Sequence, residues 1–257
     1  MSRWARFLAG DRQGFGVVRQ GLLEEYEGDM FTGARPSGRQ HALGNCRLLS
    51  PCRPRHIVAL WNNFHALAAK LGKAAPAHPL FLLKAASSLA GPGDVIKRPG
   101  GYSGKIAFEG ELAIVIGGRC AEVSADDAPR YIFGYTCIND VTAGEILNEN
   151  PDFPQWTRSK SFPTFSCVGP WIETDLEFSR SNVVTRLDGV ERQNYPLSDM
   201  VFAPNELVSR LSWDMELQPG DVIACGTSLG VGSMKDGATV EIEIDGIGCL
   251  KNTVSSH

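Results

Sequence analysis

The chain has 257 residues, of which 43% are hydrophobic and 21% charged, and its formal net charge at pH 7 is −4. A chain of this length can bury one large core, or one main domain and a small second one. Its composition excludes disordered and fibrous proteins, and its weak acidity provides no basic surface for nucleic acid or an anionic membrane. No segment approaches the roughly 20 apolar residues of a membrane span, and Gly10, Asp11 and Arg12 interrupt any signal-peptide core. We therefore expect a cytoplasmic protein with no nucleic-acid and no membrane partner.

The cysteines are odd in number and scattered, without a C-x-x-C pair. They are Cys46, Cys52, Cys120, Cys137, Cys167, Cys225 and Cys249. Disulfide frameworks and thiolate zinc sites both need closer, paired spacing. We expect reduced thiols and no zinc.

The first fifty residues are expected to form a small β unit. Residues 3–8 and 15–18 are strand-like and are separated by turn residues, which predicts a hairpin. Residues 35–38 are expected to form a loop, and the two prolines in residues 51–55 predict a stiff boundary. The expected organisation is a small N-terminal β domain over residues 1–54 and a larger domain over residues 55–257.

The larger part is also expected to be mostly β-structure. Residues 106–116 have the strongest strand pattern, with apolar residues on both faces, as in a strand that is covered on both sides. Further strands are expected at residues 57–61, 131–138, 221–225 and 239–244, and helices at residues 64–71 and 205–213. Thr142 to Glu145 matches a capping box, so a short helix should begin there. The predicted fold class is β-rich α+β.

Glu109 and Glu111 stand two residues apart in the strongest strand. Side chains at this spacing point to the same face of a strand. On a covered strand two adjacent like charges are costly unless they are neutralised by protonation, by basic partners or by a divalent cation. The alternative is that this end of the strand is exposed and both glutamates are solvated.

Asp140 follows the apolar run of residues 131–138, at the kind of loop position that often presents functional groups. Taken alone it reads as an ordinary helix N-cap. Together with Glu109 and Glu111 it makes an all-oxygen set without histidine or thiolate. Such a set favours Mg2+ or Mn2+, with Ca2+ also possible, over zinc.

Two further features are less specific. Lys160, within residues 156–162, would by itself be read as a solvated surface residue. Residues 226–232 (GTSLGVG) follow a strand, and they form either a flexible turn or a loop that brings backbone donors to an anion.

In chain order, these segments resemble the fumarylacetoacetate hydrolase superfamily. The matching stretches are residues 81–84 (FLLK), 89–94 (LAGPGD), 108–117 (FEGELAIVIG), 134–142 (GYTCINDVT), 160–162 (KSF), 169–171 (GPW), 217–223 (LQPGDVI) and 246–252 (GIGCLKN). The resemblance covers residues 55–254, and its E-x-E with a downstream N-D-V-T is specific in combination. It is similar in particular to the bacterial branch of 2-hydroxyhepta-2,4-diene-1,7-dioate isomerases and 5-carboxymethyl-2-oxo-hex-3-ene-1,7-dioate decarboxylases. The first fifty residues look like the small domain that many bacterial members carry.

The resemblance implies a mixed β-roll or sandwich catalytic domain, usually in a homodimer. It also implies a Mg2+ or Mn2+ ion on Glu109, Glu111 and Asp140, with Lys160 as a catalytic residue beside the substrate. Lys84, Thr164 and Thr227 lie in motifs near the substrate, which would be a small 2-oxo acid.

The chain departs from the family pattern in the segment that covers the site. Many hydrolytic and decarboxylating members have a His and a Glu three residues apart, where this chain has Leu67 and Lys70. His65 is a nearby substitute, although a lone histidine is more often an ordinary surface or core residue. The T-A-R-D run is Thr142-Ala143-Gly144-Glu145, Ser228 replaces a proline, and Pro163 replaces an aspartate.

From the resemblance we expect a divalent-metal-dependent enzyme that passes through a metal-stabilised enolate of a 2-oxo or 2-hydroxy-dienoic acid in catabolism. C–C hydrolysis, decarboxylation and isomerisation all start from that intermediate. Because hydrolysis also needs a base to activate water, the lost pair favours proton transfer or decarboxylation. The alternative is a catalytically degenerate protein that binds 2-oxo acids or oxalate-like anions through the metal.

Overall fold

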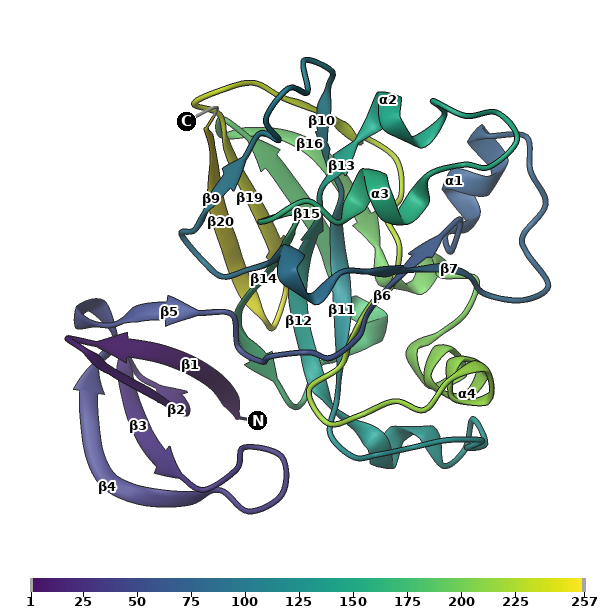
Figure 1. Cartoon of the computed structure of the whole chain (residues 1–257). Helices are drawn as coiled ribbons and strands as arrows, with labels where there is room; N and C mark the ends of the chain where they lie inside the picture. The colour runs from purple at the N-terminus through teal and green to yellow at the C-terminus, as the bar shows by residue number, and fades with distance from the viewer. Residues whose placement is uncertain (1, 256–257) are drawn as a thin grey trace.

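The computed structural model describes residues 2–255, and strands dominate it, which confirms the predicted β-rich class (Figure 1). The largest sheet has the order β4-β3-β2-β1-β14-β12-β11-β17-β6-β7, with β5 paired to β1 and β8 paired to β14. Its strands are β1 (Arg3–Ala9), β2 (Arg12–Arg19), β3 (Leu22–Glu27), β4 (Arg35–Ala42), β5 (Arg47–Leu49), β6 (Ile57–Trp61), β7 (Leu80–Lys84), β8 (Leu89–Ala90), β11 (Gly110–Ile116), β12 (Ile132–Asp140), β14 (Ser166–Glu173) and β17 (Val222–Ala224).

Two smaller sheets and four α-helices complete the described chain. One sheet orders β16 (Val190–Pro196), β15 (Asn182–Leu187), β19 (Thr239–Ile244), β20 (Gly248–Ser255) and β9 (Val95–Lys97). The other orders β13 (Thr142–Ala143), β10 (Ile106–Phe108) and β18 (Gly232–Met234). The helices are α1 (His65–Lys70), α2 (Gly144–Leu147), α3 (Trp156–Lys160) and α4 (Pro204–Asp214). None of these helices is long and apolar enough to cross a membrane.

Strand β11 is buried along its whole length, as its two apolar faces predict. Leu112 and Ile114 belong to the main core, which also contains Val240 and Ile242 of the five-stranded sheet. Ala113 and Val115 belong to a second core on the opposite face, with Ala59 of β6 and Ala224 of β17. The strand therefore lies between two packed layers, and a charged side chain on it cannot simply turn into water.

The N-terminal hairpin forms as predicted, with β1 and β2 paired from Arg3↔Val18 to Ala9↔Arg12. The predicted loop at residues 35–38 is wrong, because these residues begin β4, where Arg35 and Pro36 pair with Glu27 and Tyr26 of β3 before an irregularity in the register. Strand β4 is at the edge of the sheet, where a proline such as Pro36 is tolerated within a strand. β1 also pairs with β14, so the large sheet runs from the N-terminal strands into the main body (Figure 1). The division into residues 1–54 and 55–257 stays a prediction.

Two other local predictions are wrong. The expected strand over residues 106–116 is interrupted at Glu109, which separates β10 from β11. A short helix does begin within the Thr142–Glu145 run, at Gly144, but the predicted capping box does not form, because α2 has no side-chain cap. The Glu145 carboxylate instead accepts hydrogen bonds from the Tyr102 hydroxyl and the Lys105 backbone N–H, and Thr142 faces Glu109. All seven cysteines are free, as expected.

Candidate metal centre and active site

The break at Glu109 brings two carboxylates together. The Glu109 backbone N–H donates to Asn139 Oδ1 (3.1 Å), and its carbonyl accepts the Asp140 N–H (2.9 Å). Both backbone groups of Glu109 are thus bound to the end of β12, which places this residue beside Asp140. Regular pairing resumes with Gly110 opposite Asn139 and Glu111 opposite Ile138.

Gly110 separates the two glutamates because the other side of the strand has no room. A Cβ at this position would lie 2.0 Å from Thr185 Oγ1 and 3.2 Å from Gln193 Oε1. Both residues belong to the β15–β16 hairpin, which packs on that face. In the E-G-E sequence, the two glutamates therefore direct their carboxylates to the site, and the glycine between them allows the second sheet to pack closely against the backbone.

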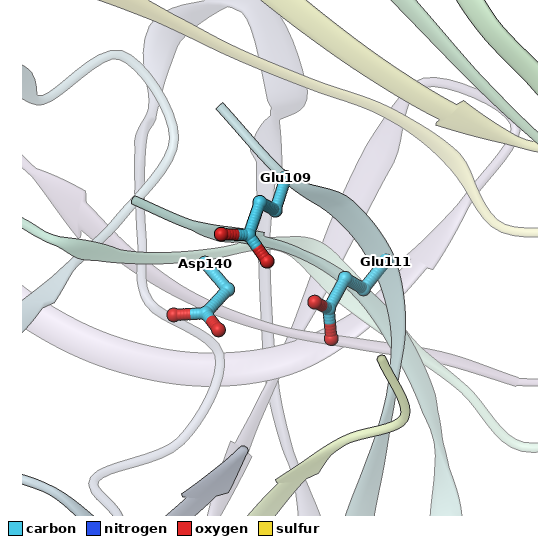
Figure 2. Close-up of side chains that lie close together, drawn as sticks. All are labelled: Glu109, Glu111 and Asp140. Atoms are coloured by element: carbon cyan, nitrogen blue, oxygen red, sulfur yellow. The ribbon is translucent and has the colours of Figure 1, made fainter. Parts of the chain in front are cut away.

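Glu109, Glu111 and Asp140 converge as the sequence predicts (Figure 2). One carboxylate oxygen from each lies within 4.8 Å of the others. Glu111 and Asp140 are buried, while the side chain of Glu109 is 17% exposed. Glu111 Oε2 accepts the Gly226 N–H (2.8 Å), but its Oε1 is buried and has no hydrogen-bond partner among the described residues.

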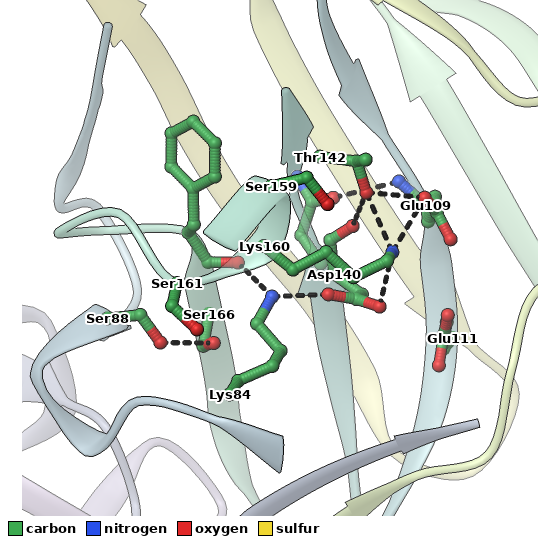
Figure 3. Close-up of polar contacts among 12 residues, drawn as sticks. Lys84, Ser88, Glu109, Glu111, Asp140, Thr142, Ser159, Lys160, Ser161 and Ser166 are labelled. Atoms are coloured by element: carbon green, nitrogen blue, oxygen red, sulfur yellow. Dashed lines mark hydrogen bonds and ion pairs between the residues drawn. The ribbon is translucent and has the colours of Figure 1, made fainter. Parts of the chain in front are cut away.

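Two lysines enter the same cluster (Figure 3). Lys160, at the end of α3, donates to Glu109 Oε1 (2.8 Å), Asp140 Oδ2 (2.7 Å) and the Thr142 hydroxyl (2.7 Å). Lys84, at the end of β7, contacts Asp140 Oδ1 and donates to the Phe165 carbonyl (2.7 Å). Both ammonium groups gather on the Asp140 and Glu109 side, and Glu111 has no cationic hydrogen-bond partner within the described chain.

Burial and charge set the ionisation of the cluster. Burial, with the nearby charges of Asp140 and Glu109, raises the pKa of Glu111 well above its usual value. Burial also opposes the charge of Asp140, but Lys160 and Lys84 outweigh it and lower the pKa of that carboxyl. Burial lowers the pKa of Lys84, whereas the three carboxylates keep the pKa of Lys160 raised despite its burial.

These residues fit a hard divalent cation. The donors are all oxygens, which suits Mg2+, Mn2+ or Ca2+ better than a softer metal. Three carboxyl groups face two lysines, so the cluster would carry an excess of negative charge once Glu111 is ionised to hold a cation. Glu111 Oε1 is a buried acceptor without a hydrogen-bond partner among residues 2–255, and leaving such an atom unsatisfied costs free energy of folding. Glu109, Glu111 and Asp140 would hold the ion.

Thr227 lies next to this cluster, held by residues that the sequence did not identify. Its hydroxyl donates to the Gly110 carbonyl (3.1 Å) and accepts from Gln193 Nε2 (2.8 Å). Gln193 Oε1 accepts the Gly110 N–H (3.0 Å), and the Tyr195 hydroxyl donates to the Gly110 carbonyl. Gln193 therefore fixes strand β11 against the loop after β17. Only its position in a buried hairpin could have suggested this role.

Thr142 is another residue whose role the motif did not reveal. Its hydroxyl donates to Glu109 Oε1 (2.5 Å) while accepting from Lys160. Thr164, by contrast, is bound to backbone: its hydroxyl accepts the Lys97 N–H (2.8 Å) and donates to the Pro163 carbonyl (2.5 Å). The assignment of Thr164 to the substrate stays a prediction.

The segment expected to cover the site contains α1. Asn63, just before it, donates to the Cys225 carbonyl (2.8 Å), next to the residue that binds Glu111. His65 and Lys70 are exposed on the helix, while Leu67 packs against the main core. None of the hydrogen bonds within residues 2–255 joins His65 to the carboxylates. Its catalytic role stays a prediction.

Comparison with known families agrees with this geometry. Residues 56–255 match the family described as fumarylacetoacetate (FAA) hydrolase, C-terminal, and residues 2–51 match one described as Rv2993c-like, N-terminal. The chain belongs to the fumarylacetoacetate hydrolase family. The resemblance expected from the E-x-E and N-D-V-T motifs is thus confirmed.

Curated relatives match over most of their length. The chain is 40% identical over 221 residues to Protein Rv2993c of Mycobacterium tuberculosis, which covers 85% of this chain and 82% of the relative. It is 34% identical over 228 residues to the oxaloacetate tautomerase YisK of Bacillus subtilis, covering 83% and 75%.

Solved structures share the complete fold. A 2-hydroxyhepta-2,4-diene-1,7-dioate isomerase from Mycobacterium marinum has 35% identity and a TM-score of 0.91, covering 99% of this chain and 98% of the other. A maleylpyruvate hydrolase from Sphingobium sp. SYK-6, solved with manganese(II) and pyruvate, has 28% identity and a TM-score of 0.80, covering 98% of each chain.

Proposed function

We propose that this protein is a Mg2+- or Mn2+-dependent enzyme that moves a proton on a small 2-oxo or 2-hydroxy-dienoic acid, as an isomerase or tautomerase. The observation that carries the proposal is the buried cluster of three carboxylates with one oxygen left unpartnered, flanked by two lysines. A bound divalent cation would supply Lewis-acid polarisation of the 2-oxo group.

The remaining chemistry belongs to the chain itself. Lys160 stands beside the carboxylates, where its ammonium group is placed to stabilise the negative charge that develops when a proton leaves the substrate. Thr142 holds that ammonium group in place through its hydroxyl oxygen. Lys84 offsets part of the charge of Asp140, so the loaded site as a whole attracts an anion.

Proton transfer is favoured over C–C hydrolysis because hydrolysis needs a base that activates water in addition to the group that takes the substrate proton and returns it, and the cover segment offers no positioned base for that water. Leu67 and Lys70 occupy the places of the family's His and Glu, and His65 is exposed. Activating water for hydrolysis needs a base within hydrogen-bond reach of that water. Two relatives that are named as an oxaloacetate tautomerase and a 2-hydroxyhepta-2,4-diene-1,7-dioate isomerase support the same choice.

A proton NMR time course tests the proposal. The Mg2+-loaded protein is given oxaloacetate, 2-hydroxyhepta-2,4-diene-1,7-dioate and an acylpyruvate, each with and without metal. Metal-dependent tautomer exchange without cleavage of the acylpyruvate is expected. Release of pyruvate from the acylpyruvate, lost in His65→Ala, would instead establish a hydrolase with His65 as its base.

The same experiment distinguishes an enzyme from the alternative of a protein that only binds the acids. Metal-dependent line broadening of the acids with no exchange and no product would favour a protein that binds 2-oxo acids without turnover. The homodimer implied by the family resemblance and the cytoplasmic location expected from the sequence remain expectations.

A further inference from the structure

Strand register places a tryptophan beside the metal cluster. Ala113 of β11 is opposite Ala224 of β17, and Ala224 is beside Ala59 of β6. Beyond this pair, the Gly226 N–H donates to Glu111 Oε2 (2.8 Å), and Trp61 ends β6 two residues after Ala59. Neighbouring strands are about 4.8 Å apart, so β6, two strands away from β11 in the sheet, runs about 10 Å from it.

Trp61 also faces the same side as Glu111. Side chains alternate along a strand, and Ala113 and Ala59, each two residues away from Glu111 and Trp61 respectively, belong to the same core layer. Leu80, opposite Trp61 on β7, is 42% exposed. Trp61 and Leu80 thus form an apolar, partly exposed surface on the side of the sheet that carries Glu111. We call this surface the wall.

A second tryptophan reaches this wall from α3. The rings of Trp156 and Trp61 have centroids 5.7 Å apart at an angle of 54°. Trp156 is four residues before Lys160, a spacing that puts both on one face of the helix. The Thr157 hydroxyl donates to the Leu83 carbonyl (2.9 Å), which fixes α3 on β7. Helix α3 therefore carries a cation to the carboxylates at one end and an aromatic ring to Trp61 at the other.

The chain around this wall is basic. Residues 57–93 contain Lys70, Lys73 and Lys84, together with His65 and His78, and no Asp or Glu. The exposed Lys73 places its ammonium group 5.7 Å from the centre of the Trp61 ring, and no salt bridge joins it to a carboxylate within residues 2–255. At the start of α1, Asp199 accepts a hydrogen bond from the Ala66 N–H (3.0 Å).

We propose that Trp61, Trp156 and Lys73 form a distal subsite that selects the substrate. The flat, unsaturated chain of a 2-oxo or 2-hydroxy-dienoic diacid lies against the two indole rings, and its far carboxylate meets Lys73. The subsite favours a seven-carbon diacid over oxaloacetate, which is too short to reach the wall from the carboxylate cluster. This inference rests on the proposed function, because the near end of the diacid occupies the metal site.

The test compares two probes on the Mn2+-loaded protein by isothermal titration calorimetry. Oxalate occupies only the metal-proximal end, and 2-hydroxyhepta-2,4-diene-1,7-dioate extends to the wall. The variants are Trp61→Leu, Trp156→Leu and Lys73→Met, with Lys235→Met as a control at another exposed lysine. Thermal unfolding checks that each variant is folded, and two separate tryptophan variants keep the test informative if one of them unfolds.

We expect the seven-carbon diacid to bind about tenfold more weakly to either tryptophan variant and about fivefold more weakly to Lys73→Met, since stacking and an exposed ionic contact have these sizes. Oxalate affinity should change less than twofold in all four variants. Equal loss for both probes, or no loss for the diacid, would overturn the subsite and leave the proposed function standing. Failure of the wild type to bind oxalate with Mn2+ would overturn both.

Discussion

Glu25 in the N-terminal strands and Glu111 in the main body are both buried carboxylates, and they differ in their surroundings. Glu25 Oε1 accepts from Arg12 (2.7 Å) and Arg39 (2.9 Å), and its Oε2 lies 2.8 Å from His41 Nε2. Glu111 has one backbone donor and one oxygen without a partner. The effect on pKa is opposite: hydrogen bonding to Arg39, aided by His41 and Arg12, lowers the pKa of Glu25 to about 2 despite burial, while burial raises that of Glu111.

The contrast separates two uses of a buried charge. A carboxylate that the chain itself neutralises holds strands together. One that the chain leaves partly unpartnered is suited to a ligand that arrives from outside. If this is correct, changes at Glu111 should affect activity more than stability, and changes at Glu25 should do the reverse.

The largest expected effect is that of Glu111→Gln on turnover. Removing one ligand of the proposed metal site should lower metal-dependent kcat/KM more than about 100-fold, beyond the loss seen for residues that only support metal ligands. The free energy of unfolding without metal should not fall, because a neutral amide replaces a carboxyl group whose charged form burial already disfavours. Wild-type turnover in this variant, measured by NMR, would exclude Glu111 from the site.

Gln193→Leu should have an intermediate effect. The change removes the acceptor of the Gly110 N–H and a donor to Thr227 without touching a carboxylate. We expect about a tenfold loss in kcat/KM with metal affinity also reduced, as for other residues that position metal ligands. Measuring Mn2+ affinity beside the kinetics distinguishes this role from general destabilisation, which would lower the melting temperature and leave affinity in the folded protein unchanged.

Glu25→Gln should act on stability instead. It weakens charge-assisted hydrogen bonds to Arg12, Arg39 and His41, and a loss of about 1–3 kcal/mol in the free energy of unfolding is expected from urea denaturation. Because Arg12 and Arg39 are half-exposed, water can solvate them, which keeps the loss at this level. Turnover at saturating metal should equal that of the wild type; a parallel loss of activity would break the contrast.

The smallest expected effect is the pH dependence of the difference in unfolding free energy between wild type and Glu25→Gln. A carboxyl whose pKa is lowered on folding, here from 4.5 to about 2, contributes stability that is full above 4.5 and is lost as the pH falls toward 2. The stability difference between wild type and Glu25→Gln should therefore shrink between pH 5 and pH 2. A difference that stays constant over this range, measured by urea denaturation, would contradict the assignment of the lowered pKa to Glu25.

The sequence predicted those features of the fold and the site that depend on local patterns of residues. The two glutamates at strand spacing and Asp140 at the end of an apolar run could be joined into one site before the structure was known. The role of Gln193 could not be predicted, because Gln193 is 83 residues away from Gly110 in the sequence. Nothing in the sequence of its hairpin indicates that contact. The break at Glu109 was also hidden, since its apolar neighbours continue the strand pattern. Residues 35–38 have turn composition, but pairing with β3 overrides it.

Mn2+ titration of the metal-free protein, followed by electron paramagnetic resonance, tests the central claim most directly. One Mn2+ per chain should bind to wild type and to Glu25→Gln, and binding should be lost in Glu111→Gln. Binding to Glu111→Gln with wild-type stoichiometry and affinity would contradict the assignment of Glu109, Glu111 and Asp140 as the metal centre.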